Sequence, residues 1–71
     1  MNYKVTLNWD NEAKVWYALS DDVPGLALES PSYDKLIDRV KSAVTELLEL
    51  NNIIDPNISI NFTSERLEKV A

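Results

Sequence analysis

Apolar side chains recur at helical spacing along residues 32–50, which predicts one long amphipathic helix. The spacing i, i+3, i+4, i+7 is typical of a helix with a single buried stripe. We expect Ser32 to cap the first turn, with Ser30-Pro31 as an alternative start. Asn51-Asn52 are expected to end the helix and Asp55-Pro56 to prevent its continuation. The apolar stripe comprises Tyr33, Leu36, Ile37, Val40, Ala43, Val44, Leu47, Leu48 and Leu50.

Two stretches before this helix have the pattern of longer β-strands. Residues 2–9 alternate strictly, so the apolar side chains share one side of the strand. Residues 15–20 carry apolar groups on both sides, and the sequence alone does not decide which side meets the helix. The first strand points Tyr3, Val5, Leu7 and Trp9 one way. The second pairs Trp16 with Ala18 on one side, and Val15, Tyr17 and Leu19 on the other.

Two shorter stretches complete the predicted sheet. Residues 26–29 form a third strand that leads into the helix, and residues 57–63 alternate again after it. Residues 10–14 are polar and turn-prone, which predicts a hairpin between the first two strands. Pro24-Gly25 contains the only glycine of the chain, and this pair predicts a type II turn.

The order of elements predicts an α+β fold, a single βββαβ domain over residues 1–63 with a short polar tail over residues 64–71. The first three strands form an antiparallel meander, and the helix packs on one face of the sheet. The fourth strand returns parallel to the first at its free edge through a right-handed crossover. We expect one extra helical turn around Leu67 and Val70. Because one helix covers one face only, we expect the other face, or an open sheet edge, to self-associate.

Composition excludes several classes of protein. The 71 residues contain no cysteine and no histidine, so neither a disulfide nor an ordinary zinc site is expected. The net charge of −5 disfavours binding to a phosphate backbone. There is no apolar run of membrane-spanning length and no signal-peptide core. We therefore expect a cytoplasmic domain that binds neither nucleic acid nor a membrane.

The candidate catalytic groups are carboxylates, but each lies in a predicted turn or at a strand end. Asp is common at such positions for backbone reasons. Nucleophilic catalysis has less support, because serine has no histidine partner here. We therefore expect no enzyme, no cofactor and no metal site, with a magnesium-dependent hydrolase as the weaker alternative. The carboxylates are Asp10, Glu12, Asp21, Asp22 and Glu29.

Three short motifs precede the Ser-capped helix: Tyr3-x-Val5, Val15-Trp16-x-Ala18 and Asp22-Val23-Pro24-Gly25-Leu26. In this order they resemble the HicB-like antitoxin fold, over roughly residues 1–50. The run Glu46–Leu50 is similar to uncharacterised single-domain relatives of HicB. The resemblance implies a partial RNase H-like fold without the RNase H active site. It also implies a domain that occludes HicA, a small basic mRNA-cleaving toxin. The separate DNA-binding domain of typical HicB proteins has no counterpart here, so operator binding is not expected.

We therefore expect a small interaction domain that self-associates as a homodimer or higher homo-oligomer and masks a protein partner. A small basic HicA-like RNase toxin is the expected partner class. The alternative is a structural homo-oligomer without a toxin partner. An apolar centre with a charged rim is typical of such contact surfaces. The predicted contact residues are Lys4, Thr6, Tyr17, Leu19, Asp21, Asp22 and Glu29.

Overall fold

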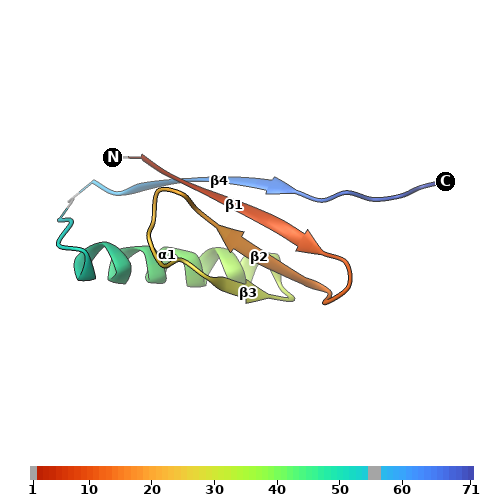
Figure 1. Cartoon of the computed structure of the whole chain (residues 1–71), viewed down its shortest axis with the longest axis horizontal. Coiled ribbons are helices and arrows are strands. Elements are labelled where there is room, and N and C mark those ends of the chain that lie inside the picture. Colours follow the sequence, from red (N-terminus) through yellow and green to blue (C-terminus); the bar gives the residue numbers. More distant parts are fainter. Residues whose placement is uncertain (1, 55–56) are drawn as a thin grey trace.

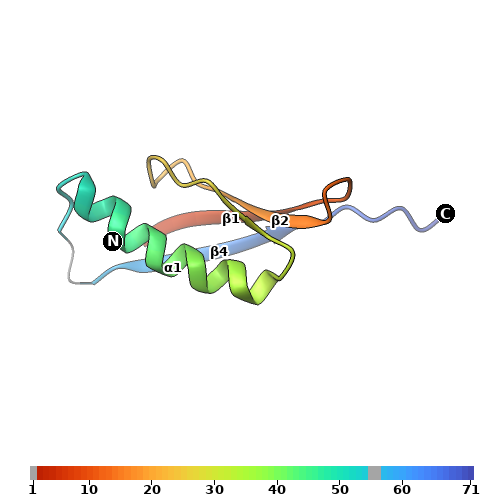
Figure 2. The same ribbon diagram turned by 90° about the horizontal axis from the view of Figure 1, so that it is seen from below.

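Four strands and one helix form two layers, with the helix lying across one face of the sheet (Figures 1 and 2). The computed structural model describes residues 2–54 and 57–71, so the expected effect of Asp55-Pro56 lies outside the described residues. The α+β prediction with the order βββαβ is confirmed. The elements are β1 (Asn2–Asp10), β2 (Val15–Leu19), β3 (Leu28–Ser30), α1 (Tyr33–Leu50) and β4 (Ser59–Glu65).

The sheet has the strand order β3-β2-β1-β4. The first three strands form an antiparallel meander, as predicted. Strand β4 lies parallel to β1, with Tyr3 opposite Ile60 and Val5 opposite Phe62. The return of the last strand to the edge beside β1 is therefore confirmed. Strands β3 and β4 form the two edges of the sheet.

Helix α1 buries one stripe of side chains spaced four residues apart. Its N-cap is Ser32, whose hydroxyl accepts from the amide of Lys35 at 3.3 Å, so the alternative start at Ser30-Pro31 is wrong. Leu50 was expected in the stripe but is 78% exposed, because it lies about 200° around the helix from Leu48. The fully buried members of the stripe are Leu36, Val40, Val44 and Leu48.

The helix ends in a Schellman-type cap. Asn52 adopts the left-handed conformation with φ of 59°, as predicted, whereas Asn51 has φ of −94°. The amide of Ile53 donates to the carbonyl of Leu48 at 2.8 Å, and the amide of Asn52 donates to that of Glu49 at 3.0 Å. These bonds satisfy carbonyls that the last turn would otherwise leave unpaired.

The β1–β2 hairpin closes through the carboxylate of Asp10. Its Oδ1 accepts from the amides of Glu12 and Ala13 at 3.0 and 3.2 Å. The amide of Lys14 donates to the Asp10 carbonyl at 2.8 Å, and Lys14 has φ of 58°. Asp10 is therefore a turn-forming residue, which is the structural role that its position in the sequence indicates.

The described C-terminal residues differ from the prediction. Strand β4 runs two residues past Thr63, because Ser64 and Glu65 still pair with Leu7 and Asn8 of β1. Residues 66–71 then continue without a helical turn, and Leu67 and Val70 are 93% and 95% exposed. A single helical turn without a surface to pack on gains too little to form. The expected extra turn is therefore wrong.

The core lies between α1 and the side of the sheet that it covers. It also includes Val23 and Leu26, from the loop before β3. Leu26 was expected in the third strand, but β3 begins at Leu28, and Leu26 packs into the core from the preceding loop. Among the described residues, no helix has the length and apolar character needed to span a membrane.

Candidate interaction face

The pairing of β1 with β2 decides which side of β2 meets the helix. Trp16 lies opposite Trp9 and Ala18 opposite Leu7, so these side chains share the face covered by α1. Successive strand residues point to opposite faces. Tyr17 and Leu19 therefore lie on the other side, which we call the open face. Leu19 is 53% exposed there, and Tyr17 is half-buried.

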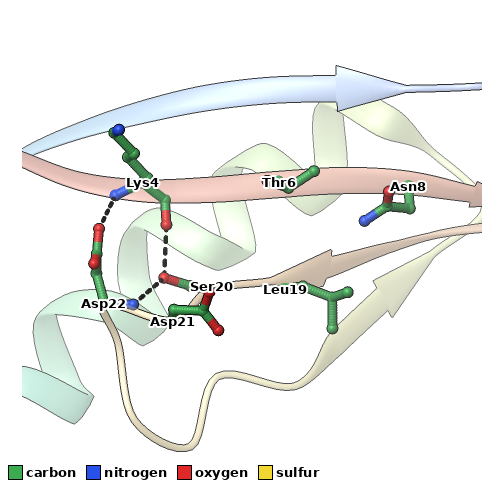
Figure 3. Close-up of a pocket in the computed structure, with 7 residues that line it drawn as sticks. All are labelled: Lys4, Thr6, Asn8, Leu19, Ser20, Asp21 and Asp22. Carbon is green, nitrogen blue, oxygen red and sulfur yellow. Dashed lines mark hydrogen bonds between the residues drawn. The ribbon is translucent and has the colours of Figure 1, made fainter.

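A shallow depression of about 400 Å³ marks one end of the open face (Figure 3). Five of the seven predicted contact residues line it. The other two, Tyr17 and Glu29, line a neighbouring depression that shares Leu19 with the first. Asn8 and Ser20 also line the first depression and were not predicted. Asn8 could have been found, because it continues the alternation of Lys4 and Thr6. The first depression is lined by Lys4, Thr6, Asn8, Leu19, Ser20, Asp21 and Asp22.

Ser20 and Asp22 complete the hydrogen bonding of β1 beyond the end of β2. The carboxylate Oδ2 of Asp22 accepts from the Lys4 amide at 2.8 Å, and the Ser20 hydroxyl donates to the Lys4 carbonyl at 2.6 Å (Figure 3). The same hydroxyl accepts from the amides of Asp22 and Val23 at 3.1 and 3.2 Å. Asp22 thus has a structural role, whatever else it contacts. Figure 3 marks no hydrogen bond from the carboxylate of Asp21 to the other residues drawn there.

The loop after Asp22 is fixed by a type II turn and by two buried side chains. The amide of Leu26 donates to the carbonyl of Val23 at 3.3 Å, and Gly25 has φ of +84°, so the predicted turn is confirmed. Val23 and Leu26 are 1% and 8% exposed. A Cβ on Gly25 would lie 3.5 Å from Leu47 Cδ2, an ordinary contact, so the backbone conformation is what requires glycine.

The charges around the open face are mainly negative. Asp21 and Glu29 are exposed at its margin, and Asp10 is half-buried at the end of β1. Lys4 brings a positive charge to the same face. An acidic margin of this kind favours encounter with a basic surface.

The covered face carries an aromatic cluster near the start of α1. The rings of Trp9 and Trp16 lie 5.4 Å apart, and Trp16 packs edge-on against Tyr33 at 5.0 Å. The Arg66 guanidinium lies 4.3 Å from the centre of the Trp9 ring. The hydroxyl groups of Tyr33 and Ser64 form a hydrogen bond. Both tryptophans are therefore packing residues on the helix side, as predicted for Trp9, rather than an open platform for bases.

Among residues 2–54 and 57–71, no three Asp or Glu side chains gather closely enough to hold a metal ion. Glu12 lies in the β1–β2 turn and Glu29 in β3, on separate segments from Asp21 and Asp22. The carboxylates named as candidate catalytic groups are therefore not gathered into one acidic cluster among the described residues.

The chain matches one family model over residues 2–70, described as a domain of unknown function, DUF1902. It is also similar to a solved structure, that of the hypothetical protein TTHA1013 from the extremely thermophilic bacterium Thermus thermophilus. The two chains share 37% sequence identity with a TM-score of 0.85, and the match covers 99% of this chain and 100% of the other. A comparison with curated proteins gives no match. Because the family model spans nearly the whole sequence, the chain belongs to the DUF1902 domains.

Proposed function

We propose that this chain is a small non-enzymatic interaction domain of HicB-antitoxin type, which masks a protein partner with its open face. The observation that carries the proposal is that Tyr17 and Leu19 lie on the face that α1 leaves uncovered. Apolar contacts at the centre of an interface supply most of its affinity, and a charged rim supplies specificity. Asp21 and Glu29 give this face such a rim.

A basic partner fits the charge of the molecule. The chain carries a net charge of −5, and acidic groups lie at the margin of the open face. The HicB-like resemblance suggests the same partner class, a small basic RNase toxin. A toxin that cleaves mRNA would place the complex in the cytoplasm. We also propose that the domain self-associates, since a chain this small, without disulfides, buries a modest core.

The residues of the HicB-like motifs contribute to the packing of the fold more than to the proposed contact surface. Val23 and Leu26 are core residues, and Pro24-Gly25 shapes the loop that carries them. The motif is therefore explained by packing, and partner recognition would depend on side chains outside it. Tyr17, which the motif leaves unspecified, is the residue that the proposal tests.

The test is a pull-down from the native host at low salt with three tagged forms of the full chain. Low salt preserves an encounter between opposite charges, which is screened within about 10 Å at 0.1 M salt. The wild type should retain a small basic protein in stoichiometric amount, and Tyr17→Lys should lose it. Leu50→Lys is the matched control, because Leu50 is 78% exposed on the other layer.

Circular dichroism melting of each form separates binding from folding. Tyr17→Lys should melt close to the wild type, since Tyr17 is not in the core. Leu19→Lys provides a second variant on the same face, with a side chain already 53% exposed. Recovery of the bait alone, or retention of the partner by both folded variants, would contradict the masking function.

A further inference from the structure

The last residues of the chain form an extension that leaves the body of the molecule. We call residues 66–71 the C-terminal arm. In both views the arm runs past the β1–β2 hairpin and ends away from the other elements (Figures 1 and 2). Its two apolar side chains, Leu67 and Val70, are 93% and 95% exposed. Two such side chains on one short extension leave apolar area that the monomer does not bury.

The arm continues an edge strand that carries little of the usual protection against pairing. Strand β4 pairs with β1 on one side and forms the edge of the described sheet on the other. Edge strands are normally blunted by charged side chains, especially lysine, by proline or by a bulge. The β4 sequence, Ser59–Glu65, contains neither proline nor lysine, and its one charged residue, Glu65, lies at the end of the strand. Its outer edge therefore offers backbone donors and acceptors in line with the arm.

Arg66 fixes how the arm starts. Its guanidinium lies 4.3 Å from the Trp9 ring centre and 5.8 Å from that of Trp16, both on the covered face. Arg66 also forms an ion pair with Glu68, so these two side chains share one side. The alternation of β4 therefore continues into the arm, which places Leu67 on the opposite side.

The charges along Glu65–Lys69 are arranged symmetrically about Leu67, with opposite signs at matching positions. In an antiparallel pair of two copies centred on Leu67, Glu65 of one copy faces Lys69 of the other. Arg66 likewise faces Glu68, and Leu67 faces Leu67. Opposite charges across an antiparallel pair stabilise it, and like charges destabilise it.

Neighbouring registers lose this match. A pair centred on Arg66 would place Arg66 against itself, and a pair centred on Glu68 would place Glu68 against itself. Because only directly opposite residues on the same face interact closely, the charges select the register centred on Leu67. The segment is thus complementary to a second copy of itself.

We propose that the chain forms a two-fold homodimer in which the end of β4 and the C-terminal arm pair antiparallel with the same segment of a second copy, centred on Leu67. The proposal deepens the proposed function, because it rests on the self-association included there and names its surface. A two-fold interface uses the same patch on both copies, which is what a self-complementary segment provides. Val70 of one copy then lies opposite Ser64 of the other, beside Phe62, so both exposed apolar residues of the arm gain contacts.

The first test is sedimentation velocity over a concentration series of up to about 1 mM, where even weak association is populated. Lys69→Glu places like charges opposite each other twice in each dimer and should raise the dimer Kd by about tenfold or more. The double variant Glu65→Lys with Lys69→Glu restores opposite signs and should recover the wild-type Kd. Lys35→Glu is the matched control, since it makes the same change in net charge on an exposed helix position.

The second test uses the absence of cysteine from the chain. Opposite residues of an antiparallel pair have Cα atoms about 4.5–5.5 Å apart, within the range that a disulfide bridges. Leu67→Cys should therefore form a covalent dimer under mild oxidation, whereas Leu50→Cys, at another exposed leucine, should remain monomeric.

The outcomes separate this proposal from the masking function. A monomer at all concentrations would overturn the homodimer and the self-association proposed above, and would leave the pull-down result unaffected. If Lys69→Glu leaves the dimer Kd unchanged, or if the two cysteine variants cross-link equally, the arm is not the dimer interface. Self-association itself would still be supported by either result.

Discussion

The two faces of the sheet are built from alternate residues of the same strands, yet their side chains have different surroundings. Leu7 on the covered face is fully buried, while its neighbour Thr6 lies on the open face. Ala18 in β2 is 2% exposed, and Leu19 beside it is 53% exposed. Helix α1 is what separates the two environments, because it covers one face only.

This difference indicates where the fold constrains the sequence. On the covered face, apolar side chains contact one another across β1, β2 and α1, so each is explained by the stability of the domain. On the open face, Tyr17 and Leu19 have no covering layer in the described chain. Side chains that the fold does not require are the ones available for recognition of a partner.

The largest expected effect comes from shortening one leucine on each face. Leu7→Ala should lower the free energy of unfolding by about 2–5 kcal/mol, since it leaves a cavity in the core. Leu19→Ala should change it by less than about 0.5 kcal/mol, as is usual for surface positions. Urea denaturation of both variants measures the contrast. Equal losses would mean that the open face is packed in solution.

The sequence was sufficient to predict the helix, the strand order and the covered residues of β1. Those features follow from periodicity, which reports how each element meets its neighbour. Ser32 and Asn52 were predictable as caps because few residue types serve those positions well. Tyr17 and Leu19 were predicted to contact a partner from the uncovered face, although the apolar pattern of β2 alone did not decide which of its sides meets the helix.

The remaining features depend on tertiary pairing. The side of β2 that meets α1 was undetermined, because both sides are apolar and only the pairing of Trp16 with Trp9 decides it. A backbone role for Asp22 was predicted from its position in a turn, but its hydrogen bond to the Lys4 amide was not, because that bond depends on β2 ending before Ser20 can pair as a strand residue. The residue at which a neighbouring strand ends cannot be read from the local sequence pattern.

An intermediate loss of stability is expected at the boundary between the two faces, where the Asp22 carboxylate accepts a hydrogen bond from the backbone of β1. Asp22→Ala should cost about 1–1.5 kcal/mol, because the Lys4 amide loses a charge-assisted acceptor. Asp22→Asn, which keeps an oxygen acceptor, should cost less. Asp21→Ala is the matched neighbour and should change the free energy of unfolding by less than about 0.5 kcal/mol.

Thermal and urea unfolding of these three variants separates a structural carboxylate from one available for contact. If Asp21→Ala weakens partner binding while leaving stability unchanged, and Asp22→Ala lowers both, the division of roles between adjacent aspartates is supported. Equal stability losses at both positions would show that the loop responds to charge in general rather than to the bond with Lys4.

The smallest expected effect tests whether polar contacts on the open face contribute to stability. Thr6 and Thr63 face each other across β1 and β4, with their hydroxyl oxygens 3.2 Å apart. Thr6→Val keeps the shape and the β-branched side chain but removes the hydroxyl. Because water competes for an exposed hydroxyl, the free energy of unfolding should change by less than about 0.5 kcal/mol. A loss above about 1 kcal/mol would mean that the open face is excluded from water. Since the monomer leaves that face uncovered, such a loss should then depend on protein concentration, which repeating the denaturation at two concentrations would reveal.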